Sequence, residues 1–214
     1  MSLFVDITKR LGDFVLDASF SSDDPSETLA ILGASGCGKS MTLKCIAGIE
    51  RPDKGRIVLN DRVLFDSEAR VDVPVQERRV GYLFQSYALF PTMTVLDNVM
   101  AGVRGGPRNE RRERALERIR AFRLEGLEGL RSAELSGGQQ QRCALARIMA
   151  NDPELLLLDE PFSALDGYLR WQLELELADT LRAFPGGVVF VTHSRDEVYR
   201  MSQRVCVLDH GKSG

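Results

Sequence analysis

Short apolar runs separated by polar turns mark both ends of the chain. Residues 3–7 and 13–20 alternate apolar and polar side chains, which is typical of antiparallel strands joined by a turn near Leu11 and Gly12. Residues 28–32 and 154–158 are continuous apolar runs, and the second predicts a central parallel strand covered on both faces. Further short apolar runs predict strands at residues 56–60, 79–84, 188–192 and 204–208.

A helical pattern occupies the middle of the chain. It runs from about residue 86 to 151 with a break at residues 105–107, and two further helices are predicted at 40–49 and 168–184. Because strands and helices alternate on both sides of this stretch, the sequence predicts one α/β domain, residues 1–214, with a mixed or parallel central sheet. Residues 1–86 and 152–214 would form its core, with an antiparallel β subdomain at the N-terminus. Residues 87–151 would form an inserted α-helical subdomain.

The composition is that of a soluble globular protein. The chain has 214 residues, of which 43% are hydrophobic and 28% charged, and its net charge of −3 argues against a nucleic-acid partner. No apolar run approaches the roughly 20 residues of a membrane span, and the N-terminus lacks a signal-peptide pattern, so we expect a cytoplasmic protein. The eight arginines and three glutamates between residues 104 and 123 fit a solvated helix face better than a surface for anionic lipid.

The strongest chemical signal follows the predicted strand at residues 28–32. The next eight residues fit the phosphate-binding pattern Gly-x4-Gly-Lys-Ser, and they are Gly33, Ala34, Ser35, Gly36, Cys37, Gly38, Lys39 and Ser40. Glycines let backbone N–H groups turn towards phosphate, and the helix that follows adds a favourable dipole. We expect Lys39 to reach the β- and γ-phosphates of a nucleotide, Ser40 to offer its hydroxyl to Mg²⁺, and Met41 to add a backbone N–H. The sequence therefore predicts a P-loop NTPase fold.

Two carboxylates follow the apolar run that ends at Leu158. A strand ending in Asp159 and Glu160 places both side chains at the carboxyl edge of the sheet, where ligands of open α/β sheets bind. Asp159 is expected to hold Mg²⁺, and Glu160 to polarise the water that attacks the γ-phosphate. Without the phosphate loop, the same residues would fit a plain acidic turn after a strand.

A Ser-Gly-Gly turn at residues 136–138 opens the predicted helix that runs to about Ala150. The N-terminus of such a helix is a second anion-binding position. The alternative is an N-capped helix that follows a flexible turn and binds nothing.

Six motifs in this order resemble those of ABC-type ATPases. They are the phosphate loop, Gln85, the Leu-Ser-Gly-Gly-Gln sequence at 135–139, the run 155–160, the Ser-Ala-Leu-Asp sequence at 163–166, and His193. The resemblance covers nearly the whole chain. It implies an ATPase in which two copies pack head to tail around two ATP molecules. Ser136, Gly138 and Gln139 would then contact the γ-phosphate that the other copy holds.

The resemblance also implies roles for single residues. Gln85 would sense Mg²⁺ and the attacking water, so we expect it among both the metal-binding and the catalytic residues. His193 would contact the γ-phosphate and position Glu160, and Asp166 would communicate across the dimer. Taken alone, Gln85 fits a surface polar residue, and His193 fits a structural histidine.

The first hairpin departs from the family pattern. Members of the family usually stack adenine on an aromatic residue there, but Leu11 stands where the aromatic is expected. Phe14 is the nearest substitute and is our candidate for the adenine contact. It fits the core of the hairpin equally well.

The partners follow from the resemblance and from the missing membrane span. Separate transmembrane permease subunits and, indirectly, a solute-binding protein are implied, which places the chain on the inner face of the cell membrane as an importer subunit. Tyr87, Leu89, Phe90, Met93 and Val95 would form either an apolar groove for the permease or the core of the helical subdomain.

The identity of the cargo is a weaker expectation. Residues 84–91 and 64–67 look most similar to molybdate-importer ATPases, with sulfate, iron, sugar and polyamine importers as alternatives. The small C-terminal β domain of many relatives is expected to be absent or removed. A soluble ABC ATPase of DNA repair or of the ribosome is the rival function, but the long coiled coil or second cassette of those proteins is not found here.

Overall fold

The computed structural model describes residues 2–24, 27–162 and 167–214, and within them the strands form one continuous sheet. Its order is β6-β5-β4-β1-β2-β11-β10-β3-β9-β8-β7. One half is mainly antiparallel and contains β1 (Leu3–Leu11), β2 (Phe14–Ser22), β4 (Lys54–Leu59), β5 (Arg62–Asp66), β6 (Val71–Asp72) and β11 (Lys212–Ser213). The other half is parallel and contains β3 (Thr28–Leu32), β7 (Val80–Leu83), β8 (Leu155–Asp159), β9 (Gly187–Thr192) and β10 (Arg204–Asp209).

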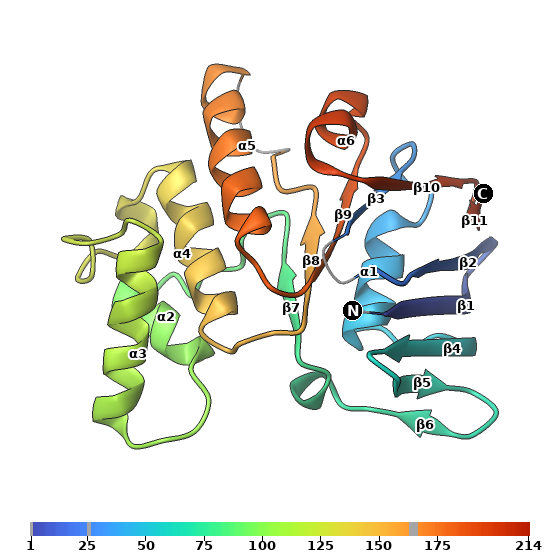
Figure 1. Ribbon diagram of the computed structural model, residues 1–214, viewed down its shortest axis with the longest axis horizontal. Helices are drawn as coiled ribbons and strands as arrows, with labels where there is room; N and C mark the ends of the chain where they lie inside the picture. The colour runs from blue at the N-terminus through green and yellow to red at the C-terminus, as the bar shows by residue number, and fades with distance from the viewer. Residues whose placement is uncertain (1, 25–26, 163–166) are drawn as a thin grey trace.

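The helices lie on both faces of the parallel half and to one side of it (Figure 1). They are α1 (Lys39–Ala47), α2 (Val95–Gly102), α3 (Arg108–Ala121), α4 (Gly137–Met149), α5 (Gly167–Arg182) and α6 (Arg195–Met201). Side chains of β8 point alternately to the two faces, as a strand requires. Leu155 and Leu157 share a core with α1 and the antiparallel strands, whereas Leu156 and Leu158 share a core with α4 and α5. The helices α1 and α4 therefore lie on opposite faces of the sheet.

The helices α2, α3 and α4 have a hydrophobic core of their own. It contains Val95 and Val99 from α2, Ala115 and Ile119 from α3, and Cys143 from α4, all of them buried. In Figure 1 these three helices stand to one side of the sheet, away from the antiparallel strands. The predicted P-loop NTPase fold is confirmed, with its antiparallel β part, its parallel sheet and its helical part.

Several element boundaries differ from the sequence prediction. The helical pattern expected from residue 86 is interrupted, because α2 begins only at Val95, after Tyr87 and Ala88 have taken left-handed φ angles of 60° and 45°. Residues 122–136 are largely irregular, with only a short 3₁₀ turn at Ser132–Glu134. The sequence reading missed β5, β6, β11 and α6. No helix among the described residues is long and apolar enough to cross a bilayer.

Candidate functional site

Four parallel strands bring the expected chemical residues to one edge of the sheet. The strands β3, β9, β8 and β7 are neighbours in that order, and their registers place Leu32 beside Thr192 and Leu158 beside Leu83. The phosphate loop follows β3, His193 follows β9, and the two carboxylates end β8. Gln85 comes two residues after β7 and is exposed. Residues far apart in the sequence therefore share the carboxyl edge.

The phosphate loop needs its glycines for space as well as for conformation. Gly38 has a φ of 108°, and a Cβ there would lie 2.8 Å from Leu16 Cδ1. A Cβ on Gly33 would lie 2.2 Å from the backbone oxygen of Leu208. The loop can thus turn back over the start of α1 only if these positions lack side chains. Among the other loop residues, Ala34, Ser35 and Gly36 are exposed and Cys37 is buried.

Lys39 lies folded into this loop. Its ammonium donates to the backbone oxygens of Gly33 and Ala34, at 2.8 Å each, and lies 4.0 Å from Glu160 Oε1. The residue is 4% exposed, so its charge is held among backbone oxygens rather than in water. A buried cation in a glycine-rich loop at the start of a helix suits a ligand that carries several negative charges.

Ser40 and Asp159 meet at the start of α1. Ser40 Oγ donates to Asp159 Oδ1 at 2.7 Å, and Tyr82 Oη donates to Asp159 Oδ2 at 2.8 Å. The carboxylate is only 7% exposed. A hydroxyl and a carboxylate are hard oxygen ligands of the kind that Mg²⁺ takes when phosphates and water complete its shell. Ser40 and Asp159 therefore fit Mg²⁺, and the metal role expected for these two residues and for Gln85 stays a prediction.

Glu160 stands between the phosphate loop and His193. Its Oε1 lies 3.7 Å from His193 Nδ1 and, as noted above, 4.0 Å from Lys39 Nζ. Glu160 also has a left-handed φ of 44°, which is uncommon for a residue with a side chain and is found more often at functional sites. The side chain of His193 is 56% exposed, which does not fit a buried structural histidine.

The loop after Gln85 is fastened to α4. Arg147 of α4 donates to the backbone oxygens of Ala88 at 2.8 Å and of Tyr87 at 3.0 Å, and its guanidinium lies 5.3 Å from the Phe90 ring centroid. The five residues expected to form an apolar groove differ in their exposure. Tyr87 is buried, as is Val95, while Phe90 is 45% exposed; Met93 is also exposed and Leu89 is half-buried.

Ser136, Gly138 and Gln139 form the first turn of α4. Ser136 Oγ accepts from Gln139 N at 3.3 Å, and Ser136 N donates to Gln139 Oε1 at 2.8 Å, which is a capping box. A Cβ on Gly138 would lie 2.9 Å from Leu173, so the glycine allows α4 and α5 to pack closely. The N-cap that the sequence predicted as an alternative to anion binding is present. Ser136 itself is exposed. Asp166 and the rest of residues 163–166 lie outside the described residues.

Phe14 lies against the phosphate loop. It opens β2 after a two-residue turn, and a Cβ on Gly38 would lie 3.3 Å from its Cζ. The ring is half-buried and packs on the core around α1, while Leu11 is 40% exposed. This geometry agrees with both interpretations of Phe14, as part of the hairpin core and as a contact for nucleotide.

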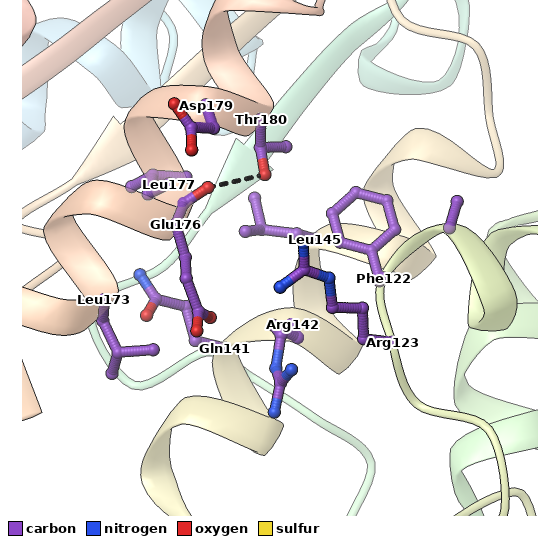
Figure 2. A pocket seen from close by; sticks show the side chains of 11 residues that line it. Phe122, Arg123, Gln141, Arg142, Leu145, Leu173, Glu176, Leu177, Asp179 and Thr180 are labelled. Atoms are coloured by element: carbon purple, nitrogen blue, oxygen red, sulfur yellow. Dashed lines mark hydrogen bonds between the residues drawn. The ribbon is translucent and has the colours of Figure 1, made fainter.

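A cavity of about 250 Å³ lies elsewhere, between α4 and α5 (Figure 2). Gln141, Arg142 and Leu145 line it from α4, facing Leu173 and Glu176 of α5. None of the phosphate-loop residues and neither Asp159 nor Glu160 lines it. The cavity belongs to the junction between helices rather than to the carboxyl edge.

Sequence reasoning missed two groups that support the site. Tyr82 lies inside the apolar strand β7, and the signal for it was a hydroxyl one residue before the end of the strand that pairs with β8. Glu197 of α6 is 3% exposed and accepts from the hydroxyl of Thr192, which in turn accepts from Ser194 N at 3.0 Å. These bonds fix the turn that carries His193. The Ser-x-x-Glu spacing of Ser194 and Glu197, which marks the start of α6, was the local signal for them.

Comparison with known proteins gives concordant results. The ABC transporter family profile matches residues 17–163. The Fe(3+) ions import ATP-binding protein FbpC of Brucella abortus (strain 2308) is 41% identical over 97% of this chain and 58% of FbpC. The spermidine/putrescine import ATP-binding protein PotA of Pasteurella multocida (strain Pm70) is 44% identical over 96% of this chain and 55% of PotA. The chain thus spans less than two thirds of the length of these relatives.

A solved structure shares the fold. The ATP-binding cassette MJ0796, in a dimeric post-hydrolysis state bound to ADP and Pi, superposes with a TM-score of 0.79. It has 30% sequence identity, and the match covers 100% of this chain and 96% of that one. The family profile covers more than half of the chain, and both relatives match almost all of it. The chain therefore belongs to the ABC transporter family.

Proposed function

We propose that this chain is the ATP-hydrolysing subunit of an ABC importer. The observation that carries the proposal is the meeting of Lys39, Ser40, Asp159, Glu160 and His193 at the carboxyl edge of four parallel strands. That set offers a cation for phosphate, oxygen ligands for a metal, and a carboxylate that can accept a proton from water.

Each residue has a defined task in this proposal. Backbone N–H groups of residues 33–41 and Lys39 bind the phosphates, and Ser40, Asp159 and Gln85 hold Mg²⁺. When bound, Mg²⁺ neutralises charge on the phosphate oxygens. Glu160 accepts the proton of the attacking water, and His193 orients that carboxylate and contacts the γ-phosphate.

The site is completed by a second copy. Ser136, Gly138 and Gln139 start a helix on the opposite face of the sheet from α1, and Ser136 is exposed. A head-to-tail pair presents that helix N-terminus to the γ-phosphate in the other copy, and the two-fold arrangement makes two equal sites. The dimeric state of MJ0796 supports this arrangement.

The partners we propose are transmembrane permease subunits and, through them, a solute-binding protein. The chain would sit on the inner face of the membrane, with the exposed Phe90 and Met93 among its contacts. The cargo is a small charged solute. Ferric iron and polyamine are named for the two relatives, and molybdate is suggested only by residues 84–91 and 64–67. Uptake of the three solutes by cells with and without the functional chain distinguishes them.

Phosphate release tests the proposed chemistry directly. The purified chain is expected to hydrolyse Mg-ATP with a rate per molecule that rises with protein concentration, because the active form is a dimer. Lys39→Ala serves as the inactive control. A rate no higher than that of Lys39→Ala at every concentration would contradict the ATPase proposal. Hydrolysis by a chain that co-purifies with ribosomes or DNA rather than with membrane proteins would favour the soluble alternative.

A further inference from the structure

Tyr82 is a buried tyrosine bonded to Asp159 of the proposed metal site, and no task has been assigned to it above. It lies in β7, pairs in parallel register with Leu157 of β8, and is 9% exposed. Leu157 and Tyr82 belong to the core on the α1 face, and Asp159, two residues further along β8, points to the same face. The tyrosine therefore reaches Asp159 from the neighbouring strand, on the side where Ser40 begins α1.

The Asp159 carboxylate is divided between two donors. Oδ1 accepts from Ser40 and Oδ2 accepts from Tyr82, at 2.7 and 2.8 Å. The two donors differ in whether they could also bind a metal. Ser40 would itself be an oxygen ligand of Mg²⁺, so its hydroxyl would be shared between the metal and Oδ1, whereas the phenol would keep its bond to Oδ2.

The ring of Tyr82 is held firmly enough for this task. Its centroid lies 4.5 Å from that of Phe84, and the residue is 9% exposed. The hydroxyl donates to Asp159 Oδ2 at 2.8 Å. A buried donor on one carboxylate oxygen fixes the direction in which the other oxygen points.

Resting on the proposed function, we infer that Tyr82 is a positioning residue that orients Asp159 towards Mg²⁺. Tyr82→Phe keeps the ring and its packing but leaves Oδ2 without this donor. The carboxylate can then rotate, and we expect Mn²⁺, used as a probe for Mg²⁺, to bind the ADP complex about tenfold more weakly, as is usual when the outer partner of a metal ligand is lost. ADP binding in EDTA should be unchanged.

The chain supplies a matched control. Tyr87 is also buried, and its hydroxyl has no hydrogen-bond partner among the described residues, so Tyr87→Phe removes a phenol oxygen from the same kind of environment. Mn²⁺ affinity, followed by electron paramagnetic resonance of the free ion, should be unchanged in Tyr87→Phe. The effect of Tyr82→Phe should also disappear in an Asp159→Asn background, because Tyr82 acts through that carboxylate.

The outcomes separate this inference from the function on which it rests. If the wild-type ADP complex binds no Mn²⁺, the proposed metal site itself is wrong. If the wild type binds Mn²⁺ and Tyr82→Phe binds it equally well, only the role of Tyr82 is overturned. Should Tyr82→Phe unfold more easily, the increase in melting temperature caused by Mn²⁺ over EDTA still reports the metal affinity of the folded fraction. An increase equal to that of the wild type would again refute the role.

Discussion

At the residue scale, the site depends on a few side chains held in uncommon positions. Glu160 takes a left-handed φ immediately after a buried strand, and its backbone N–H donates to Val191 of the neighbouring strand at 3.2 Å. This turn directs the carboxylate away from the sheet and towards Lys39 and His193. A residue with this backbone and these neighbours is suited to chemistry more than to packing.

Glu160→Gln should separate ATP binding from hydrolysis. The amide keeps the size of the side chain but cannot accept a proton from water, so we expect turnover to fall by at least about 100-fold. ATP affinity should stay close to that of the wild type, and the variant should accumulate as an ATP-bound dimer. Turnover by phosphate release and mass by light scattering measure both effects. Fast hydrolysis in this variant would exclude Glu160 as the base.

Phe14→Ala tests whether the ring contacts bound nucleotide. Stacking on a base is worth about 1–3 kcal/mol elsewhere, so loss of the ring should weaken ATP binding several-fold. Inorganic triphosphate has no base, and its affinity should not change. Titration of both ligands gives the answer, with the exposed Leu11→Ala as control. Equal losses for both ligands would mean that Phe14 only supports the loop at Gly38.

At the element scale, the sequence predicted the parts whose signals are local. The phosphate loop, the strand-end carboxylates and the start of α4 each lie within a few consecutive residues. The hairpin between β4 and β5 had a local signal that was overlooked, the Asn60-Asp61 pair. Both residues take left-handed φ angles, 50° and 62°, and Asn and Asp favour such a turn.

Arg78 shows why other features could not be predicted. A fully buried arginine is rare, and this one donates to the backbone oxygens of Cys45 and Ile46 at the end of α1, and to Asp72. Its partners come from two separate segments, so only the folded chain identifies it as the group that closes the last turn of α1. The role of Tyr82 is hidden in the same way, because its partner Asp159 is 77 positions away.

Arg147 connects two elements, and its replacement should loosen the loop after Gln85. Arg147 bonds Ala88 and Tyr87 from two different nitrogens of one planar guanidinium, and a lysine, with a single nitrogen at its tip, cannot reproduce that geometry. Loss of a charged hydrogen bond costs about 1.5–3 kcal/mol. Arg147→Lys is therefore expected to speed hydrogen exchange in residues 86–94 relative to the exposed-site control Arg120→Lys. Unchanged exchange would show that the loop is held by other contacts.

At the scale of the whole molecule, the proposed pair would give each chain two half-sites. The phosphate loop, Asp159 and Glu160 form one half, and the first turn of α4 forms the other. Since α1 and α4 lie on opposite faces of the sheet, the second half faces a different molecule in the proposed pair. This arrangement makes hydrolysis a property of the assembly, which mixing experiments can detect.

Mixing two inactive variants should restore activity. Lys39→Ala destroys one half-site and Ser136→Arg destroys the other. Neither homodimer therefore has a working site. In a mixed dimer, the intact phosphate loop of the Ser136→Arg chain faces the intact α4 of the Lys39→Ala chain. One of the two sites of the mixed dimer is then complete. Random pairing makes half of the dimers mixed, so an equal mixture should reach up to about a quarter of the wild-type rate if the two sites act independently. A site formed within one chain would give no recovery at any ratio, and full activity of Ser136→Arg alone would contradict the composite site.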